Sequence, residues 1–260
     1  MRVVIKVGTS TLAHATGKLN IRLTGELCRA ISDLKNAGHE IILVSSGAIG
    51  MGVGKLALAE KPTDIPTKQA AAAVGQCELM YTYDRLFTEY NHTVAQILLT
   101  GSDFSSAERH ENFNNTLERL LELGALPIIN ENDTIATEEI KVGDNDTLSA
   151  LVAVSVNAEL LIILSDVNGL YSADPHKNKD AKLIERVHGM PEEVFSLAGG
   201  AGSSLGTGGM LTKLKAAKIC GEAGCDTVIA NGEAPEILYD ILAGTPAGYT
   251  RFYAEKSEQV

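Results

Sequence analysis

The sequence predicts an α/β fold in which helices cover both faces of a mainly parallel β-sheet. Short β-rich segments alternate with longer segments whose apolar residues recur at helical spacing, which is typical of βαβ units. Some of the short segments are apolar at every position, as expected of strands buried on both faces. Glycine and polar residues follow directly after four of them. Because ligands of open α/β sheets bind beyond the carboxyl ends of the strands, this pattern also predicts the place of the site.

The first elements can be read directly from the N-terminal part of the chain. A strand is expected at 1–7, followed by a break at Gly8. Asn20 has the character of an N-cap, and the apolar stripe that follows predicts a helix ending at Gly38. A continuous apolar run at 40–44 predicts a strand covered on both faces.

The rest of the chain continues the alternation. Further strands are expected at 93–99, 126–129, 160–164, 227–230 and, as a final edge strand, 250–253. Further helices are expected at 48–59, from 67 to about 90, and at 113–124, 148–156, 210–224 and 236–242, with a short hairpin within 137–146. No linker interrupts the pattern, so a single domain is expected over 1–260.

Composition excludes several classes of function. The formal net charge is −11, and the basic residues form no blocks, which disfavours nucleic acid and anionic membranes as partners. No apolar run approaches the roughly 18 residues needed to cross a bilayer, and no signal-peptide pattern is present, so a cytoplasmic protein is expected. The four cysteines form no CxxC pair and are expected to be buried, reduced thiols: Cys28, Cys77, Cys220 and Cys225.

The common motifs of nucleotide and metal enzymes fail. Gly54-Lys55 is followed by Leu56, where a Walker A loop needs Ser or Thr; no GxGxxG or HExxH occurs, and no GxSxG elbow follows an expected strand. The six histidines have no ligand spacing. Zinc chemistry, nicotinamide chemistry and triad hydrolysis therefore lose support.

A glycine-rich segment at 206–213 favours phosphate binding. Three glycines lie within four residues, a helical pattern follows, and Lys213 falls in its first turn. Glycines allow close backbone approach, helix N-termini attract anions, and lysine adds a point charge suited to phosphate. A glycine-rich turn before an ordinary surface helix is the competing interpretation.

Phosphoryl transfer needs cations and a divalent ion more than covalent chemistry. Lys6 and Lys213 are the candidate cations, and Asp144, Asp146 and Asp166 are candidates for holding metal or orienting the lysines. For Lys6 the alternative is a solvated strand end; for the aspartates it is helix capping or turn formation.

These segments together resemble the glutamate 5-kinase family of the amino acid kinase superfamily. The resemblance runs from residue 2 to about 253 and rests on segments 6–10, 44–49, 130–133, 140–146, 169–175 and 206–213. It implies an αβα sandwich around a mainly parallel sheet of about eight strands. It also implies that 1–164 is mostly an acceptor-binding lobe and 165–260 mostly a nucleotide-binding lobe.

The resemblance further implies ATP-dependent phosphorylation of the γ-carboxylate of L-glutamate, the first step of proline biosynthesis. Mg²⁺ would come with the ATP phosphates and not be held directly by protein residues. Catalytic roles fall on Lys6 and Lys213, and the glutamate-binding residues are Ser46, Asp133, Asn145, Asp144 and Asp146. The nucleotide-binding residues are Lys6, Gly8, Ser165, Asp166, Thr207, Gly208, Gly209, Met210, Leu211, Thr212 and Lys213.

The same resemblance implies inhibition by proline, a homodimer or homotetramer, and handover of the labile acyl phosphate to glutamate-5-semialdehyde dehydrogenase. The C-terminal PUA domain of many family members is expected to be absent. Two alternatives remain: a kinase of this fold acting on acetylglutamate, carbamate, aspartate or a nucleoside monophosphate, and an amino-acid sensor without catalysis. Lys6, Lys213 and the glycine-rich segment count against a sensor.

Overall fold

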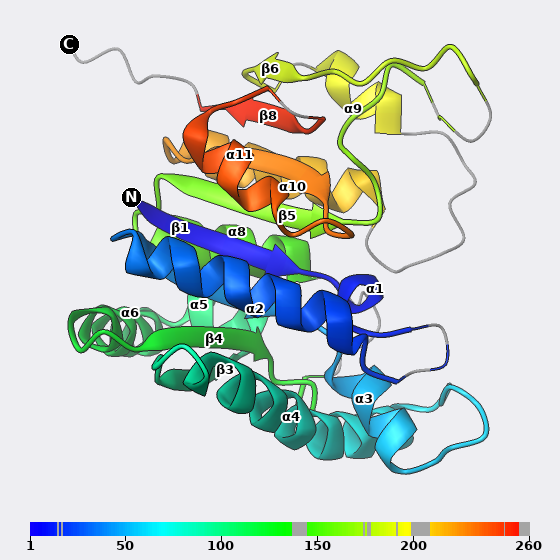
Figure 1. Ribbon diagram of the computed structural model, residues 1–260, viewed down its shortest axis with the longest axis vertical. Coiled ribbons are helices and arrows are strands. Elements are labelled where there is room, and N and C mark those ends of the chain that lie inside the picture. The colour runs from blue at the N-terminus through cyan, green and yellow to red at the C-terminus, as the bar shows by residue number, and fades with distance from the viewer. Residues whose placement is uncertain are drawn as a thin grey trace.

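Eight strands form one sheet in the part of the chain that the structure, a computed structural model, describes (Figure 1). That part comprises residues 1–14, 16, 18–136, 145–173, 175, 178–190, 192–198, 209–246 and 248–254. The strand order is β3-β4-β2-β1-β5-β7-β8-β6. In chain order the strands are β1 (Arg2–Val7), β2 (Glu40–Ser45), β3 (Val94–Leu99), β4 (Leu126–Glu131), β5 (Leu160–Ser165), β6 (Arg186–His188), β7 (Asp226–Asn231) and β8 (Thr250–Tyr253).

Neighbouring strands of the described sheet pair in parallel, except that β7 and β8 are antiparallel. The expected mainly parallel α/β sheet is therefore confirmed. The expectation that 250–253 is an edge strand is wrong. β8 lies between β7 and the three-residue strand β6, which forms the edge. So short a strand carries too little periodicity to be predicted from the sequence.

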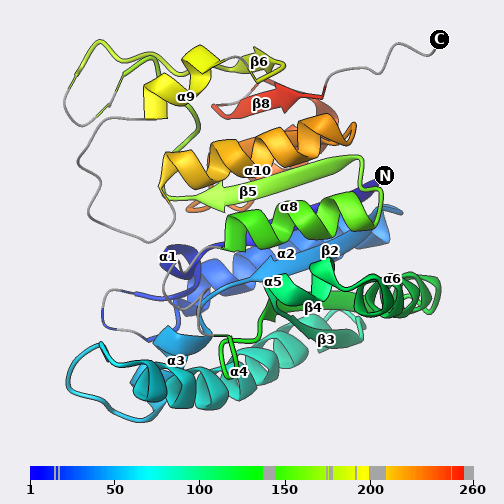
Figure 2. The ribbon, with the colours of Figure 1, turned by 180° about the vertical axis from the view of Figure 1, so that it is seen from behind.

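Helices cover both faces of this sheet. The helical elements are α1 (Thr9–Leu12), α2 (Ile21–Asn36), α3 (Ala48–Lys55), α4 (Ile65–Thr88), α5 (Gly101–Ser105), α6 (Ala107–Glu122), α8 (Asn145–Ser155), α9 (Glu192–Ala198), α10 (Met210–Glu222) and α11 (Ile237–Ala243). Helices α2, α4 and α11 cover the face seen in Figure 1. Figure 2 shows the opposite face, where α8, α10 and α6 lie.

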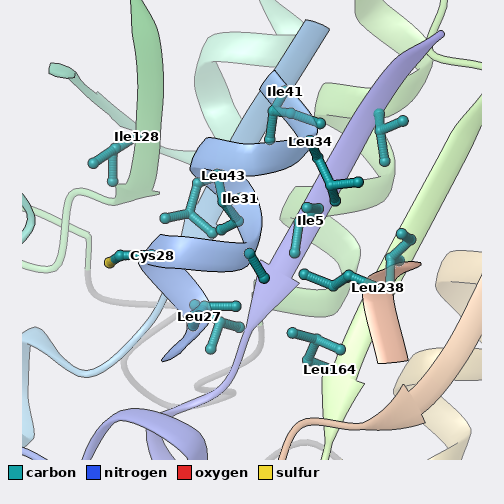
Figure 3. Packing of buried hydrophobic residues seen from close by; sticks show 14 of the residues in the cluster. Ile5, Leu27, Cys28, Ile31, Leu34, Ile41, Leu43, Ile128, Leu164 and Leu238 are labelled. Carbon is teal, nitrogen blue, oxygen red and sulfur yellow. The ribbon is translucent and has the colours of Figure 1, made fainter. Parts of the chain in front are cut away.

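Strand β1 separates the two apolar cores by simple alternation. Val3 and Ile5 belong to the core under α2, whereas Val4 belongs to the core under α8 and α10. In Figure 3, Ile5 lies close to Leu34 of α2 and to other side chains of this first core. The next residue on the side of Val4 is Lys6, so the strand directs that side chain toward the α8 and α10 layer.

Helices α3 and α4 cross so closely that glycine is required at the contact. A Cβ atom on Gly75 would overlap the carbonyl oxygen of Ala48, and one on Gly52 would overlap that of Ala71. Because α3 begins two residues after Ser46, this crossing fixes the segment that follows β2.

Other sequence expectations meet mixed outcomes. Of the expected hairpin within 137–146, residues 137–144 lie outside the described part of the chain, while Asn145 and Asp146 begin helix α8. Three cysteines are buried and unpaired as expected, but Cys77 is exposed on α4. No helix among the described residues is long and apolar enough to cross a membrane.

Candidate active site

The predicted polar clusters meet at one edge of the sheet. Strands β4, β2, β1 and β5 are adjacent and parallel, and each ends at this edge. The register places the end of β1, Val7, beside Ser45 of β2 and Leu164 of β5. From β1 the chain continues to β2, β3 and β4 on one side of β1, and later returns to form β5 on the other side. This reversal is the position at which α/β sheets bind ligands.

Two lysines that are far apart in sequence meet on one buried carboxylate at this edge. Lys6 Nζ lies 2.7 Å from Asp146 Oδ1, and Lys213 Nζ lies 3.0 Å from Asp146 Oδ2. Lys6 is 7% exposed, Lys213 4% and Asp146 0%. Lys6 comes from β1, Asp146 from the first turn of α8 and Lys213 from the first turn of α10. Lys6 and Lys213, the two candidate cations from the sequence, therefore contact the same carboxylate.

The first turn of α10 contains a cation, Lys213, although the N-terminal end of a helix disfavours positive charge. Gly209 is the extended N-cap residue, and Thr212 Oγ1 lies 2.7 Å from its carbonyl oxygen and 2.8 Å from Asp146 Oδ2. A positive side chain in a first turn faces the positive end of the helix dipole. The carboxylate of Asp146 offsets that repulsion for Lys213.

The electrostatics of the cluster keep Asp146 ionised. Burial opposes the charge, but the charges of Lys6 and Lys213 and the hydrogen bonds from Lys6 and Thr212 outweigh it and hold the pKa of this carboxyl below its usual value. With both lysines charged, the cluster carries one net positive charge in a protein whose formal net charge is −11. It is a buried positive centre suited to an anionic group.

A second cluster beside the lysines consists of side-chain amides. Asn145 Nδ2 lies 2.9 Å from the carbonyl oxygen of Ser45, 2.9 Å from Ser46 Oγ and 2.9 Å from Asn130 Oδ1. Asn145 directly precedes Asp146 in α8, so the two clusters share one helix start. Ser46 and Asn145, both predicted as glutamate-binding residues, are thus brought together.

The remaining predicted residues are placed as follows. Gly8 follows β1, where a Cβ atom would lie 3.7 Å from Lys6 Nζ. Ser165 Oγ donates to Asp166 Oδ1 over 3.0 Å at the end of β5. Asp133 lies two residues beyond the end of β4. Met210 and Leu211 open α10, whereas Asp144, Thr207 and Gly208 lie outside the described residues.

Two residues of the amide cluster were not predicted as site residues. Asn130 lies within the 130–133 segment but was assigned no role, and Gln76 lies on α4, remote in sequence. Asn130 Nδ2 donates to Gln76 Oε1 over 2.8 Å. The available signal was positional: Gln76 is polar but falls three residues before Leu79 and seven before Tyr83, on the apolar stripe of its helix.

A protein-only metal site is not offered by the described residues, among which no three His, Cys, Asp or Glu side chains are grouped to hold an ion. Asp146 itself is engaged by two lysines and a threonine. Paired ammonium groups at the carboxyl edge of a parallel sheet are instead what a phosphoryl-transfer enzyme requires.

Comparison with known proteins agrees with this class. Residues 1–231 match the amino acid kinase family. Glutamate 5-kinase from Clostridium acetobutylicum is 57% identical over 93% of this chain and 90% of its own length. Glutamate 5-kinase from Clostridium perfringens is 52% identical over 99% of this chain and 97% of its own. The chain therefore belongs to the amino acid kinase family, and within it to the glutamate 5-kinases.

A solved structure supports the fold independently of close sequence similarity. Carbamate kinase from Giardia lamblia bound to AMP-PNP aligns over 98% of each chain, with a TM-score of 0.68 and 17% identity. At that identity the match concerns the fold alone.

Proposed function

We propose that this protein transfers the γ-phosphoryl group of ATP to the γ-carboxylate of L-glutamate, giving L-glutamyl 5-phosphate, the first step of proline biosynthesis. The observation that carries the proposal is the meeting of Lys6 and Lys213 on Asp146. The identity of 52–57% to glutamate 5-kinases supports the choice of acceptor.

The chemistry of the acceptor fits the residues of the site. A γ-carboxylate has a pKa of about 4.3 and is already ionised at neutral pH, so no general base has to activate it. The obstacle is repulsion between this carboxylate and the phosphoryl group. Two buried ammonium groups reduce that repulsion and stabilise the charge that spreads over the equatorial oxygens in the transition state.

In the proposal, the lysine cluster acts on the transferred phosphoryl group, and the residues around the amide cluster bind glutamate. Ser46, Asn145, Asp133 and Asp144 hold glutamate, with Asp133 facing its ammonium group and the hydroxyl and amide groups facing its α-carboxylate. The pairing of Asn145 with Ser46 supports this division, because the pair lies beside the lysines. The sequence made Asp146 a candidate for glutamate binding, for metal binding and for orienting the lysines; in the proposal it holds the two lysines in place.

The nucleotide occupies the other side of the lysines in the proposal. Gly8, Ser165, Asp166 and the segment 207–213 bind it, and Lys6 and Lys213 contact its phosphates. The position of the α10 N-terminus at this edge supports this assignment, since helix N-termini bind phosphate. Mg²⁺ would enter with the ATP phosphates and supply charge neutralisation.

An acceptor panel tests the reaction. The protein is incubated with ATP, Mg²⁺ and hydroxylamine, which traps acyl phosphates as hydroxamates, with glutamate, acetylglutamate, aspartate or no acceptor; carbamate and nucleoside monophosphates are followed by ADP release. We expect hydroxamate with glutamate alone. Turnover with another acceptor and none with glutamate would replace this proposal with another kinase of the same fold.

Regulation, assembly and location extend the proposal. Proline is expected to inhibit by occupying the glutamate site; unchanged turnover in millimolar proline would contradict this. A homodimer or homotetramer, a cytoplasmic location and handover of the acyl phosphate to glutamate-5-semialdehyde dehydrogenase remain predictions. Sedimentation of the pure protein measures its oligomeric state.

A further inference from the structure

The amide cluster continues beyond the substrate site into the interior. Gln76 of α4, Asn130 of β4 and Asn145 of α8 are 8%, 2% and 9% exposed. They form a chain of side-chain amides in which Asn145 donates to Asn130 and Asn130 donates to Gln76. Three elements remote in sequence therefore meet through three neutral side chains.

The orientation of two of these amides is fixed by backbone groups. The N–H of Glu131 donates to Asn130 Oδ1 over 2.9 Å, and an N–H can only donate, so that atom of Asn130 must be the oxygen. The carbonyl oxygen of Ser45 can only accept, so the atom of Asn145 that faces it must be the nitrogen. Asn130 Nδ2 then points to α4, where Gln76 Oε1 accepts from it.

We propose that Gln76 is a positioning residue for the acceptor site: by accepting from Asn130 it holds the amide whose oxygen orients Asn145 beside Ser46. This inference rests on the proposed function. Gln76 acts through Asn130 and Asn145 and contacts no substrate itself. Removing its acceptor leaves a buried N–H of Asn130 without a partner, and rotation of Asn130 to recover one disturbs Asn145.

Helix α4 is suited to this role because its placement is rigid. Gly75, the neighbour of Gln76, is the residue that packs against the Ala48 carbonyl of α3. Two turns further along, Tyr83 is fully buried, and its hydroxyl lies 2.8 Å from Ser45 Oγ. Tyr83 therefore offers a matched control: a buried polar contact from the same helix to the end of β2, outside the amide chain.

The experiment compares three variants of the full chain with wild type. Gln76→Met keeps the length of the side chain and removes the acceptor, Gln76→Glu retains an acceptor, and Tyr83→Phe removes the control contact. Steady-state kinetics give KM for glutamate and for ATP, calorimetry gives glutamate affinity directly, and thermal unfolding gives stability.

For Gln76→Met we expect glutamate KM and Kd to rise by about tenfold, the factor that corresponds to one buried hydrogen bond, with ATP KM within about twofold of wild type. Gln76→Glu should recover most of the glutamate affinity. Tyr83→Phe should lower stability without raising glutamate KM.

Equal effects of Gln76→Met and Tyr83→Phe on glutamate KM, or a parallel rise in ATP KM, would overturn the inference. If Gln76→Met does not fold, the glutamate affinity of Gln76→Glu decides: a loss as large as tenfold overturns it as well. A wild-type protein without glutamate turnover or glutamate binding would instead reject the proposed function.

Discussion

Lys213 is buried in the first turn of a helix, an unfavourable position for a cation, and it contacts the carboxylate of Asp146. Removing its amine should leave the fold intact, because Asp146 keeps Lys6 as a partner. The variant, however, lacks one of the two lysine amines that stabilise the transition state. We expect Lys213→Ala to lower kcat by about 10²–10³, the usual effect of losing one preorganised stabilising group. Glutamate-dependent ADP release measures it.

Lys215 supplies the control for that substitution. It lies on the same helix but is exposed, so Lys215→Ala should leave kcat within about twofold of wild type. If the two variants lost equal activity, the cause would be the helix or the overall charge, and the catalytic role of Lys213 would be refuted.

Whereas Lys213 is expected to matter mainly for turnover, Asp146 is expected to matter more for stability. Asp146→Asn would remove the carboxylate that the two buried ammonium groups of Lys6 and Lys213 both contact. Breaking a buried ion pair from one side costs about 3–5 kcal/mol, so we expect a loss of that order in the free energy of unfolding at pH 7. Urea denaturation of both proteins measures it.

The pH dependence of that difference follows from the lowered pKa of Asp146. A carboxyl whose pKa is lower in the folded state stabilises the fold fully above its unfolded pKa of about 3.9 and loses that contribution as the pH falls toward the folded value. The difference between wild type and Asp146→Asn should therefore be constant near neutrality and narrow below about pH 4. A difference that widened in acid would contradict the assignment.

At the scale of elements, the crossing of α3 and α4 couples packing to the acceptor site. Gly75→Ala places a methyl group against the Ala48 carbonyl, so the two helices must separate. We expect a loss of about 1–3 kcal/mol, the usual cost of overpacking, together with a higher glutamate KM, since α3 follows Ser46. Denaturation and steady-state kinetics on one preparation measure both.

Gly25 provides the comparison, because a Cβ atom there would meet nothing within 4 Å inside α2. Gly25→Ala should stabilise the protein by about 0.5–1 kcal/mol and leave KM unchanged. Should Gly75→Ala prove as harmless as Gly25→Ala, the close crossing would not be a constraint in solution.

The elements that sequence could predict are those whose signals are local. Helix α2 begins after Asn20, whose side chain accepts from the N–H of Leu23, and its apolar stripe faces the core as expected. Helix α5, with five residues, and strand β6, with three, carry too few positions to show a period. In the site, Lys6 and Lys213 could be predicted because one lies near the end of an apolar strand and the other follows a glycine-rich segment at a helix start. The link between Gln76 and Asn145 depends on packing of α4 against the sheet, which no local pattern encodes.

For the whole molecule, the strand order explains why residues 6, 146 and 213 can meet. β1 lies between β2 and β5, and α8 and α10 cover the same face of the sheet. Both helices begin at the edge where β5 ends (Figure 2), and Asp146 in the first turn of α8 contacts both Lys6 and Lys213. The sequence predicted the edge, because four polar clusters follow four strands. It left open the partners of Asp146, because metal binding, lysine orientation and glutamate binding all suit a carboxylate.

The thiols test whether this molecule unfolds as one unit or as two lobes. Cys77 is exposed, Cys28 lies in the core under α2, and Cys220 and Cys225 lie in the core under α8 and α10. Burial also raises the pKa of Cys28, which reduces its reactivity further. A thiol reagent such as Ellman's should therefore label one thiol rapidly in the native protein. The other three should react together, at a rate set by global opening, because a single sheet separates the two cores. If Cys220 and Cys225 reacted well before Cys28, the part from 165 onward would open independently of 1–164, and the expectation of a single domain would fail.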